Sequence, residues 1–266
     1  MKVKFIMVSF IGITSGSGGM GKSSSACNIA IGLSAIDKRV LLIESEFGIR
    51  SYDAILGIKS ETFSSFSDYC NNNANLSDII TKPEDDKMPH FITGGIESPS
   101  GDITKALCNL KMELSGEYDF IVSDVSPLNQ RVFEAFKKAC DTFLVLTDDS
   151  FISVRNSAFV VNSIKETSKA KIFAVLNKLI IDGKEASPFA EDIADEMGIS
   201  LIGIIPFDEH FSYSVEKGLP IYKYNTYSGR AYENISKRLL GESVPDYETG
   251  IGGLFNKNKF VLKHSI

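Results

Sequence analysis

A glycine-rich octet near the amino terminus constrains this chain more than any other feature. Residues 16–23 read GSGGMGKS, a complete match to the pattern GxxxxGK[ST]. Glycines adopt positive φ and carry no Cβ, so successive backbone N–H groups can turn toward one anion. A helix that begins near Lys22 adds the positive end of its dipole at the same place. The octet therefore predicts a loop that binds nucleotide phosphates.

The segments on either side of the octet support this prediction. Residues 5–14 read FIMVSFIGIT, an apolar run that is typical of a buried parallel strand. Before the next apolar run, at residues 40–43, small and apolar residues recur at helical spacing: Ala26, Ile29, Ala30 and Leu33. Strand, glycine loop, helix and strand follow in the order that a phosphate loop requires. The alternative, a Gly/Ser-rich turn that contains GKS by chance, does not account for that order.

Apolar runs alternate with amphipathic segments along nearly the whole chain. The expected strands cover residues 5–14, 40–44, 90–93, 120–124, 142–146, 171–177 and 201–205. Such alternation predicts an α/β fold, with a mostly parallel central sheet and helices on both faces. Ligands of these sheets bind at the carboxyl ends of the strands, where the octet lies. The polar stretch at residues 60–86 is expected to be a surface excursion.

Length and charge limit the functions that this chain can have. Its 266 residues, 43% of them hydrophobic, suit one α/β domain, which we assign to residues 1–247 with a tail at 248–266. The net charge of −6 disfavours a broad nucleic-acid-binding surface. We therefore expect no nucleic-acid partner.

The sequence predicts neither export nor a membrane-spanning segment. The first residues, MKVKFIMVSFIG, imitate a signal peptide but lack a small-residue cleavage site. No run approaches the roughly 20 apolar residues that cross a bilayer. The four cysteines lie far apart without a CxxC pair and are expected to be reduced, buried thiols: Cys27, Cys70, Cys108 and Cys140. These observations predict a cytoplasmic protein.

An apolar strand that ends in a carboxylate provides a partner for the octet. Residues 118–124 read YDFIVSD, the form of a Walker B element. Phosphoryl transfer needs Mg²⁺ opposite the phosphate loop. We expect Lys22 to contact the β- and γ-phosphates, Ser23 to bind Mg²⁺, and Asp124 to act on the metal directly or through water. The alternative is a strand-end aspartate that caps the next turn.

Two further carboxylates follow the second expected strand. Glu44 and Glu46 lie two residues apart at the carboxyl edge, so they point to the same side if the strand continues. Either one could position water or a hydrated Mg²⁺. The spacing alone favours this role no more than that of a solvated loop pair.

These elements together resemble the MinD/ParA family of P-loop ATPases. Members carry a deviant phosphate loop, KGGxGK[ST], an acidic DxD pair after the second strand, and a later strand that ends in Asp. Here the corresponding segments are SGGMGKS, Glu44 with Glu46, and Asp124. The segments FGIRSYDAILG, SVRNS, IGIIPFD and EKGLPIY favour the MinD branch. The resemblance spans nearly the whole chain.

The resemblance implies ATP or ADP and Mg²⁺ as cofactors. It implies adenine contacts from Asn177 and from residues 206–208. The expected nucleotide-binding residues are then Gly16, Ser17, Gly18, Gly19, Met20, Gly21, Lys22, Ser23, Ser24, Asn177, Pro206, Phe207 and Asp208. The expected catalytic residues are Lys22, Glu46, Asp124 and Glu44, and the expected metal-side residues are Ser23, Asp124 and Glu46.

Three positions depart from the family pattern. The signature lysine, which in the family reaches the partner's phosphates across an ATP-bound dimer, is Ser17 here. Each acid of the DxD pair is one methylene longer, as Glu44 and Glu46, so a water held by Glu46 is displaced by roughly 1 Å. An aspartate expected after Arg155 is Asn156. Because a lost donor to developing negative charge slows the reaction, we predict that ATP binds and is hydrolysed slowly, or needs a partner.

The carboxyl-terminal segment has the pattern of a membrane-binding helix. Residues 250–266 read GIGGLFNKNKFVLKHSI, and on a helix six apolar residues share one arc: Ile251, Leu254, Phe255, Val261, Leu262 and Ile266. The basic residues fall outside this arc. Such helices bind anionic lipid, which predicts peripheral association with the inner face of the cell membrane through residues 251–266. A frayed end, or a helix packed on its own domain, is the alternative.

The favoured function is a nucleotide-dependent switch that forms a homodimer when ATP is bound. The dimer is expected to bind the membrane and a regulatory protein partner. The process served would be spatial positioning, at the division site or a similar place. A ParA-type partitioning ATPase would need a DNA-binding surface. A bacterial tyrosine kinase-like ATPase would need a tyrosine-rich terminus, yet no tyrosine follows Tyr247. A metallocluster ATPase would need paired cysteines. A degenerate nucleotide-binding module also remains open.

Overall fold

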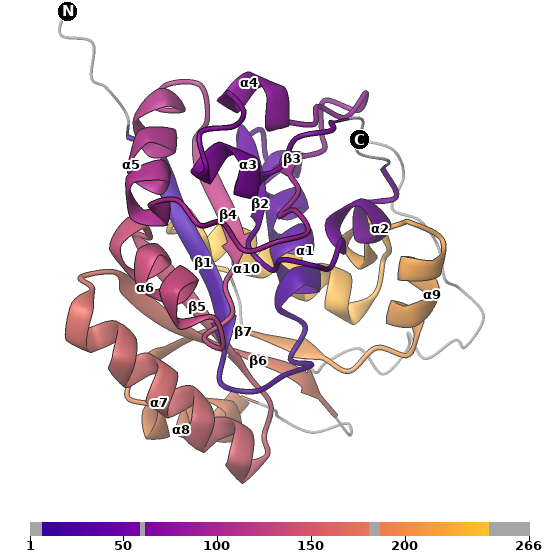
Figure 1. Ribbon diagram of the computed structural model, residues 1–266. Coiled ribbons are helices and arrows are strands. Elements are labelled where there is room, and N and C mark those ends of the chain that lie inside the picture. Colours follow the sequence, from indigo (N-terminus) through magenta and orange to yellow (C-terminus); the bar gives the residue numbers. More distant parts are fainter. Residues whose placement is uncertain (1–6, 59–61, 181–186, 245–266) are drawn as a thin grey trace, which may run out of the picture.

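A seven-stranded parallel sheet forms the centre of the molecule (Figure 1). The computed structural model describes residues 7–58, 62–180 and 187–244. The strands are β1 Ser9–Ser15, β2 Val40–Glu44, β3 His90–Ile92, β4 Phe120–Asp124, β5 Thr142–Thr147, β6 Lys171–Leu179 and β7 Ser200–Pro206. Their order is β3-β2-β4-β1-β5-β6-β7, and all paired neighbours are parallel. The predicted α/β fold with a parallel sheet is confirmed.

Helices cover both faces of the sheet. They are α1 Lys22–Ala35, α2 Tyr52–Leu56, α3 Phe66–Cys70, α4 Leu76–Ile79, α5 Ile103–Glu113, α6 Gln130–Ala139, α7 Phe151–Thr167, α8 Ser187–Glu196, α9 His210–Glu216, the 3₁₀ helix η1 Ile221–Lys223 and α10 Tyr227–Leu239. One buried core joins α1, α2, η1 and α10 to the sheet. The other core joins the helices from α3 through α8 to the opposite face. The alternation of strands and helices produces this three-layer packing.

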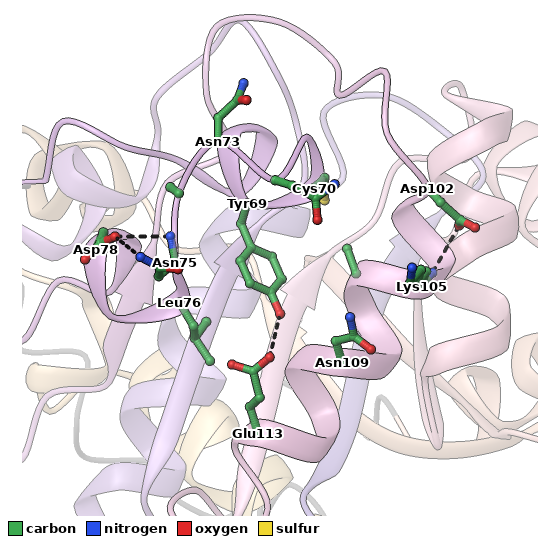
Figure 2. A pocket seen from close by; sticks show the side chains of 13 residues that line it. Tyr69, Cys70, Asn73, Asn75, Leu76, Asp78, Asp102, Lys105, Asn109 and Glu113 are labelled. Atoms are coloured by element: carbon green, nitrogen blue, oxygen red, sulfur yellow. Dashed lines mark hydrogen bonds between the residues drawn. The ribbon is translucent and has the colours of Figure 1, made fainter.

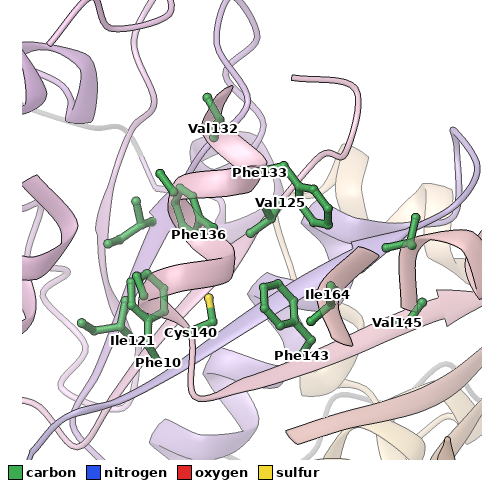
Figure 3. Packing of buried hydrophobic residues seen from close by; sticks show 14 of the residues in the cluster. Phe10, Ile121, Val125, Val132, Phe133, Phe136, Cys140, Phe143, Val145 and Ile164 are labelled. Carbon is green, nitrogen blue, oxygen red and sulfur yellow. The ribbon is translucent and has the colours of Figure 1, made fainter. Parts of the chain in front are cut away.

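Aromatic contacts fix α6 on its face of the sheet (Figure 3). Phe136 meets Phe10 of β1 edge to face, with ring centroids 5.6 Å apart. Phe133 meets Phe143 of β5 in the same way, at 6.4 Å. Asn129 caps the helix by accepting a hydrogen bond from the Val132 N–H. These contacts hold α6 over the amino-terminal halves of β1 and β5, which pair in parallel from Ile11 with Thr142 to Ser15 with Leu146.

The structure differs from the expected elements in several details. The strand β1 begins at Ser9, later than position 5, and residues 1–6 lie outside the described residues. The polar stretch 60–86 is not only a surface excursion, because Phe66 of α3 and Ile79 of α4 are completely buried in the core. A helix-like start was expected at Leu76, where α4 begins, but the burial of single apolar side chains from mostly polar helices was not evident from the composition. Cys108 is exposed, whereas the other three cysteines are buried as expected.

Within the described residues, no helix combines the length and apolarity that a transmembrane span requires. The proposed membrane-binding segment, residues 251–266, lies outside the described residues. The division of the chain at residue 247 stays a prediction.

Candidate functional site

The octet joins β1 to α1 at the carboxyl edge of the sheet. Gly19 and Gly21 have φ of 71° and 79°, a region that favours glycine. Gly21 is the N-cap residue of α1, and no side chain caps that end. The first turn of α1 therefore presents free N–H groups and the positive end of the helix dipole, which suits an anion.

Close contact with α7 determines the path of the loop at Gly16. A Cβ on Gly16 would lie 2.2 Å from the carbonyl carbon of Asn156. The Gly16 N–H donates to Ser157 Oγ at 3.3 Å. The segment SVRNS of α7 therefore packs directly against the phosphate loop at Gly16. Asn156 contributes backbone atoms to this contact.

Asp124 and Ser23 meet at the centre of the site. Ser23 Oγ donates to Asp124 Oδ2 at 2.5 Å. The other carboxylate oxygen accepts from the Tyr52 hydroxyl at 2.7 Å and from the Ser45 N–H at 3.3 Å. The Asp124 N–H in turn donates to the Tyr52 hydroxyl at 3.1 Å. Burial of the aspartate raises the pKa of its carboxyl group, and these hydrogen bonds oppose the shift.

The two glutamates have different environments. β2 ends at Glu44, so Glu46 lies beyond the strand. Glu44 is buried, and its carboxylate accepts hydrogen bonds from the Ser51 N–H and hydroxyl at 2.7 and 2.8 Å and from the Gly94 N–H at 3.2 Å. Burial raises the pKa of Glu44. The alternative of a solvated loop pair is therefore wrong for Glu44, which holds the start of α2 and the loop after β3.

Glu46 faces the phosphate loop. Its Oε1 lies 3.3 Å from Lys22 Nζ, with side-chain exposures of 30% for Glu46 and 11% for Lys22. The charge of Glu46 also acts on Asp124, where it raises the pKa of that carboxyl group. The structure therefore brings together Lys22, Ser23, Glu46 and Asp124. It uses Glu44 to position the neighbouring segments.

The end of β6 contacts the octet directly. Asn177 Nδ2 donates to Met20 O at 2.8 Å. Lys178 Nζ donates to Gly19 O at 2.6 Å. Sequence reasoning selected Asn177 and missed Lys178, whose only signal is its place directly after Asn177 at the end of a buried strand.

The remaining predicted residues lie at the end of β7. Pro206 pairs with Leu179 of β6, and the Phe207 N–H donates to Leu179 O at 2.9 Å. Phe207 is 62% exposed, and Asp208 holds His210 with an Oδ1 to Nδ1 distance of 3.0 Å. This segment begins beside the strand that carries Asn177. The exposed ring of Phe207 is able to stack on a planar base.

The side chains at this edge fit a nucleotide with a divalent metal. A hydroxyl and two carboxylates, from Ser23, Asp124 and Glu46, are hard oxygen ligands of the kind that Mg²⁺ prefers. Among the described residues, the N–H groups of Met20 and Gly21 donate to no protein acceptor. An added Cβ on Gly18 or Gly19 meets nothing within 4 Å. Free donors beside open space are what a phosphate group requires.

A hollow lies between α3, α4 and α5 (Figure 2). Tyr69 points across it and donates to Glu113 Oε1 at 3.3 Å. Its lining is polar and includes Asn109 and Asp102. None of the predicted site residues lines it. This hollow is therefore separate from the candidate site at the octet.

Known proteins resemble this chain in sequence. Septum site-determining protein MinD of Helicobacter pylori is 29% identical over 250 residues, which cover 90% of this chain and 92% of the relative. MinD of Bacillus subtilis is 24% identical over 241 residues, which cover 88% and 89%. The resemblance extends along most of both chains.

Solved structures and a family match agree with this similarity. MinD of Aquifex aeolicus has a TM-score of 0.76 at 24% identity, and the alignment covers 90% of this chain and 100% of that one. MinD of Pyrococcus horikoshii, complexed with Mg-ADP, has a TM-score of 0.75 at 20% identity, with 88% and 96% covered. These likenesses show a shared fold. Residues 11–221 match the CobQ/CobB/MinD/ParA nucleotide binding domain, so this chain belongs to that family.

Proposed function

We propose that this chain is a MinD-like switch that binds ATP with Mg²⁺ at the carboxyl edge of the sheet, dimerises in that state and hydrolyses ATP slowly. The observation that carries the proposal is the 2.5 Å contact between Ser23 Oγ and Asp124 Oδ2 beside the Lys22–Glu46 ion pair. It places a hydroxyl, two carboxylates and an ammonium at the start of a helix whose N–H groups are free. Phosphate and a divalent cation are the ligands that satisfy all of them.

Each residue has a role that follows from its position. Lys22 exchanges its contact with Glu46 for the β- and γ-phosphates, and the loop amides bind the phosphate oxygens. Ser23 and Asp124 hold the metal, which supplies charge neutralisation of the phosphates when bound. Glu46, released from Lys22, is then free to orient water. Asn177 and the segment from Pro206 to Asp208 are proposed to contact the base.

The predicted slow hydrolysis follows from Ser17. The Ser15 hydroxyl donates to Ser17 O at 2.8 Å, so the backbone at this position is held within the loop. Its short side chain carries no charge. Without a cation at the reacting phosphate, the negative charge that develops in the transition state has one hydrogen-bond donor fewer. The activation barrier for hydrolysis is then higher. We expect hydrolysis to stay slow unless a protein partner supplies the missing group.

A rim of exposed apolar residues supports dimerisation. They follow six strands at the edge that carries the phosphate loop: Ile49, Ile96, Leu128, Phe151, Ile152, Ile180 and Phe207. Apolar side chains gathered around a site are a feature of interaction surfaces. A dimer formed across this edge would cover them together with the nucleotide. The solved complex titled MinC:MinD, from Aquifex aeolicus, contains a 25% identical relative and is a precedent for a further regulatory partner.

Size-exclusion chromatography with light scattering tests the switch. The protein is run with ADP, with ATP and with a non-hydrolysable ATP analogue. We expect monomers with ADP and dimers with the analogue. Monomers in all three conditions, with nucleotide binding intact, would favour the degenerate nucleotide-binding module.

Liposome flotation tests the proposed recruitment to membrane. Full-length protein is compared with a variant that lacks residues 251–266, on vesicles with and without anionic lipid. We expect only the full-length protein to float with anionic vesicles, and more strongly as a dimer because two weak anchors then act together. Equal binding by both forms would contradict the role of the tail. Binding to DNA in its place would support the ParA-type alternative.

A further inference from the structure

Two adjacent residues of β6 hold two adjacent carbonyl groups of the phosphate loop. Asn177 Nδ2 donates to Met20 O at 2.8 Å, and Lys178 Nζ donates to Gly19 O at 2.6 Å. Lys178 has a φ of 62°, a left-handed conformation that is uncommon for lysine. Its N–H donates to Asn177 Oδ1 at 2.9 Å, which stabilises this conformation. The backbone is thus turned so that both side chains reach the loop.

These contacts orient the peptide groups of the loop. The carbonyl of Gly19 and the N–H of Met20 belong to one planar peptide group, and the carbonyl of Met20 and the N–H of Gly21 belong to the next. Both peptides are trans, so each N–H points opposite to its carbonyl. With both carbonyls bound to β6, the two N–H groups point away from β6. Both N–H groups donate to no acceptor among the described residues.

The contacts also leave little freedom for another loop conformation. Gly21 has a φ of 79°, and a Cβ placed on it would lie 2.8 Å from Asn177 Nδ2. A carbonyl oxygen turned toward the phosphates would repel them, since both carry negative charge. An ammonium under the loop opposes that rotation, because a hydrogen bond from a charged donor is about twice as strong as a neutral one.

We propose that Lys178 is a positioning residue for the phosphate chain: by holding Gly19 O, it keeps the N–H group of Met20 directed at the β-phosphate of a bound nucleoside diphosphate or triphosphate. The inference rests on the proposed nucleotide binding. Lys178, an exposed residue of β6, thus supplies a positive charge to the phosphate loop of its own chain. That loop carries Ser17 at the position of the family's signature lysine. Asn177 holds the adjoining peptide in the same way.

The proposal is tested by comparing ADP with AMP, which lacks the β-phosphate. Dissociation constants are measured by calorimetry for the wild type and for Lys178→Met, Lys178→Arg and Lys165→Met. Lys165 is the matched control, because its Nζ donates to Gly198 O at 2.8 Å and it is not among the residues of the site. In Lys178→Met we expect ADP affinity to fall about tenfold, the loss of one charged hydrogen bond, while AMP affinity changes less than about twofold. Lys165→Met should match the wild type, and Lys178→Arg should recover most of the loss.

Each other outcome contradicts the proposal in a distinct way. Unchanged ADP affinity in Lys178→Met would show that Asn177 and the glycines orient the loop without Lys178. Equal losses for ADP and AMP would place Lys178 at the base or in general stability, which thermal unfolding of the ligand-free variants measures separately. A wild type that binds neither nucleotide would refute the proposed function itself, and this inference with it.

Discussion

Ser23 Oγ and Asp124 Oδ2 lie 2.5 Å apart although 101 positions separate the residues in the chain. Ser23 stands in the first turn of α1, and Asp124 ends β4 in register with Glu44 of β2 and Ile13 of β1. The contact therefore depends on the pairing of β4 beside β1. It joins the phosphate loop to the proposed metal site.

Replacement of Asp124 by asparagine should separate metal binding from folding. The amide side chain would keep an oxygen for Tyr52 while losing the charge that attracts Mg²⁺. We expect Mg²⁺ to increase the affinity of the wild type for ADP. In Asp124→Asn this increase should be about tenfold smaller, which corresponds to about 1.4 kcal/mol. Calorimetry with Mg²⁺ or with EDTA measures the difference. An equal Mg²⁺ effect in both proteins would contradict a metal-side role for Asp124.

The same variant should change how stability depends on pH. Burial raises the folded-state pKa of Asp124, so the folded protein binds this proton more tightly than the unfolded chain. Its contribution to the unfolding free energy is greatest below the ordinary aspartate pKa of about 3.9 and falls as pH rises through the folded-state value. We expect Asp124→Asn to gain stability relative to the wild type as pH rises above about 4, until Asp124 is ionised. Urea unfolding of both ligand-free proteins at a series of pH values above about 4 measures the difference in unfolding free energy. A difference that does not change with pH would contradict the prediction.

Removal of the Tyr52 hydroxyl should destabilise the ligand-free protein. Tyr52 donates to Asp124 Oδ1 at 2.7 Å and accepts from the Asp124 N–H at 3.1 Å, both within the core. Tyr52→Phe leaves these groups buried without that partner, so we expect a loss of about 1–3 kcal/mol in urea unfolding. The control is Tyr69→Phe, whose hydroxyl meets an exposed glutamate, with an expected change within about 0.5 kcal/mol. Equal effects would show that the Asp124 contacts are weak.

Two glycines of the loop should respond differently to a methyl group. In Gly16→Ala the new Cβ meets the Asn156 carbonyl carbon at 2.2 Å, so α7 or the loop must move. We expect a loss of about 1–3 kcal/mol. In Gly18→Ala the Cβ meets nothing within 4 Å, so stability should change by about 0.5 kcal/mol or less. Thermal unfolding of both variants decides, and equal stability would contradict the close approach of α7.

A lysine at position 17 should accelerate hydrolysis. The backbone carbonyl of Ser17 already accepts a hydrogen bond, so the substitution changes the side chain and leaves this contact in place. We expect Ser17→Lys to raise the single-turnover rate by roughly 100-fold, and only at concentrations where dimers form. Ser17→Ala is the control and should stay slow. A wild type as fast as Ser17→Lys would contradict the predicted slow hydrolysis.

The local sequence predicted the fold class and several residues that the structure brings together in the candidate site. Apolar runs and their alternation with helices were enough for the α/β class, because buried parallel strands and amphipathic helices have distinct periods. The octet pointed to Lys22 and Ser23 and the end of an apolar strand to Asp124, and these three side chains lie together in the structure. Tyr52 and Lys178 were missed. Both residues act through contacts with segments distant in the chain, and neither stands in a motif that points to its partner.

The sequence by itself determined the ligand class and the architecture, since glycines at fixed spacing and the pattern of apolar residues are local properties. Only the tertiary structure decided that the two glutamates have different partners. Glu44 is buried and accepts hydrogen bonds from the N–H groups of Ser51 and Gly94, whereas Glu46 Oε1 lies 3.3 Å from Lys22 Nζ. The tertiary structure also decided that Lys178 lies under Gly19 O. The spacing of Glu44 and Glu46 cannot specify their different partners, because β2 ends at Glu44. Beyond the strand, the direction of each side chain depends on which strands and loops pack beside it.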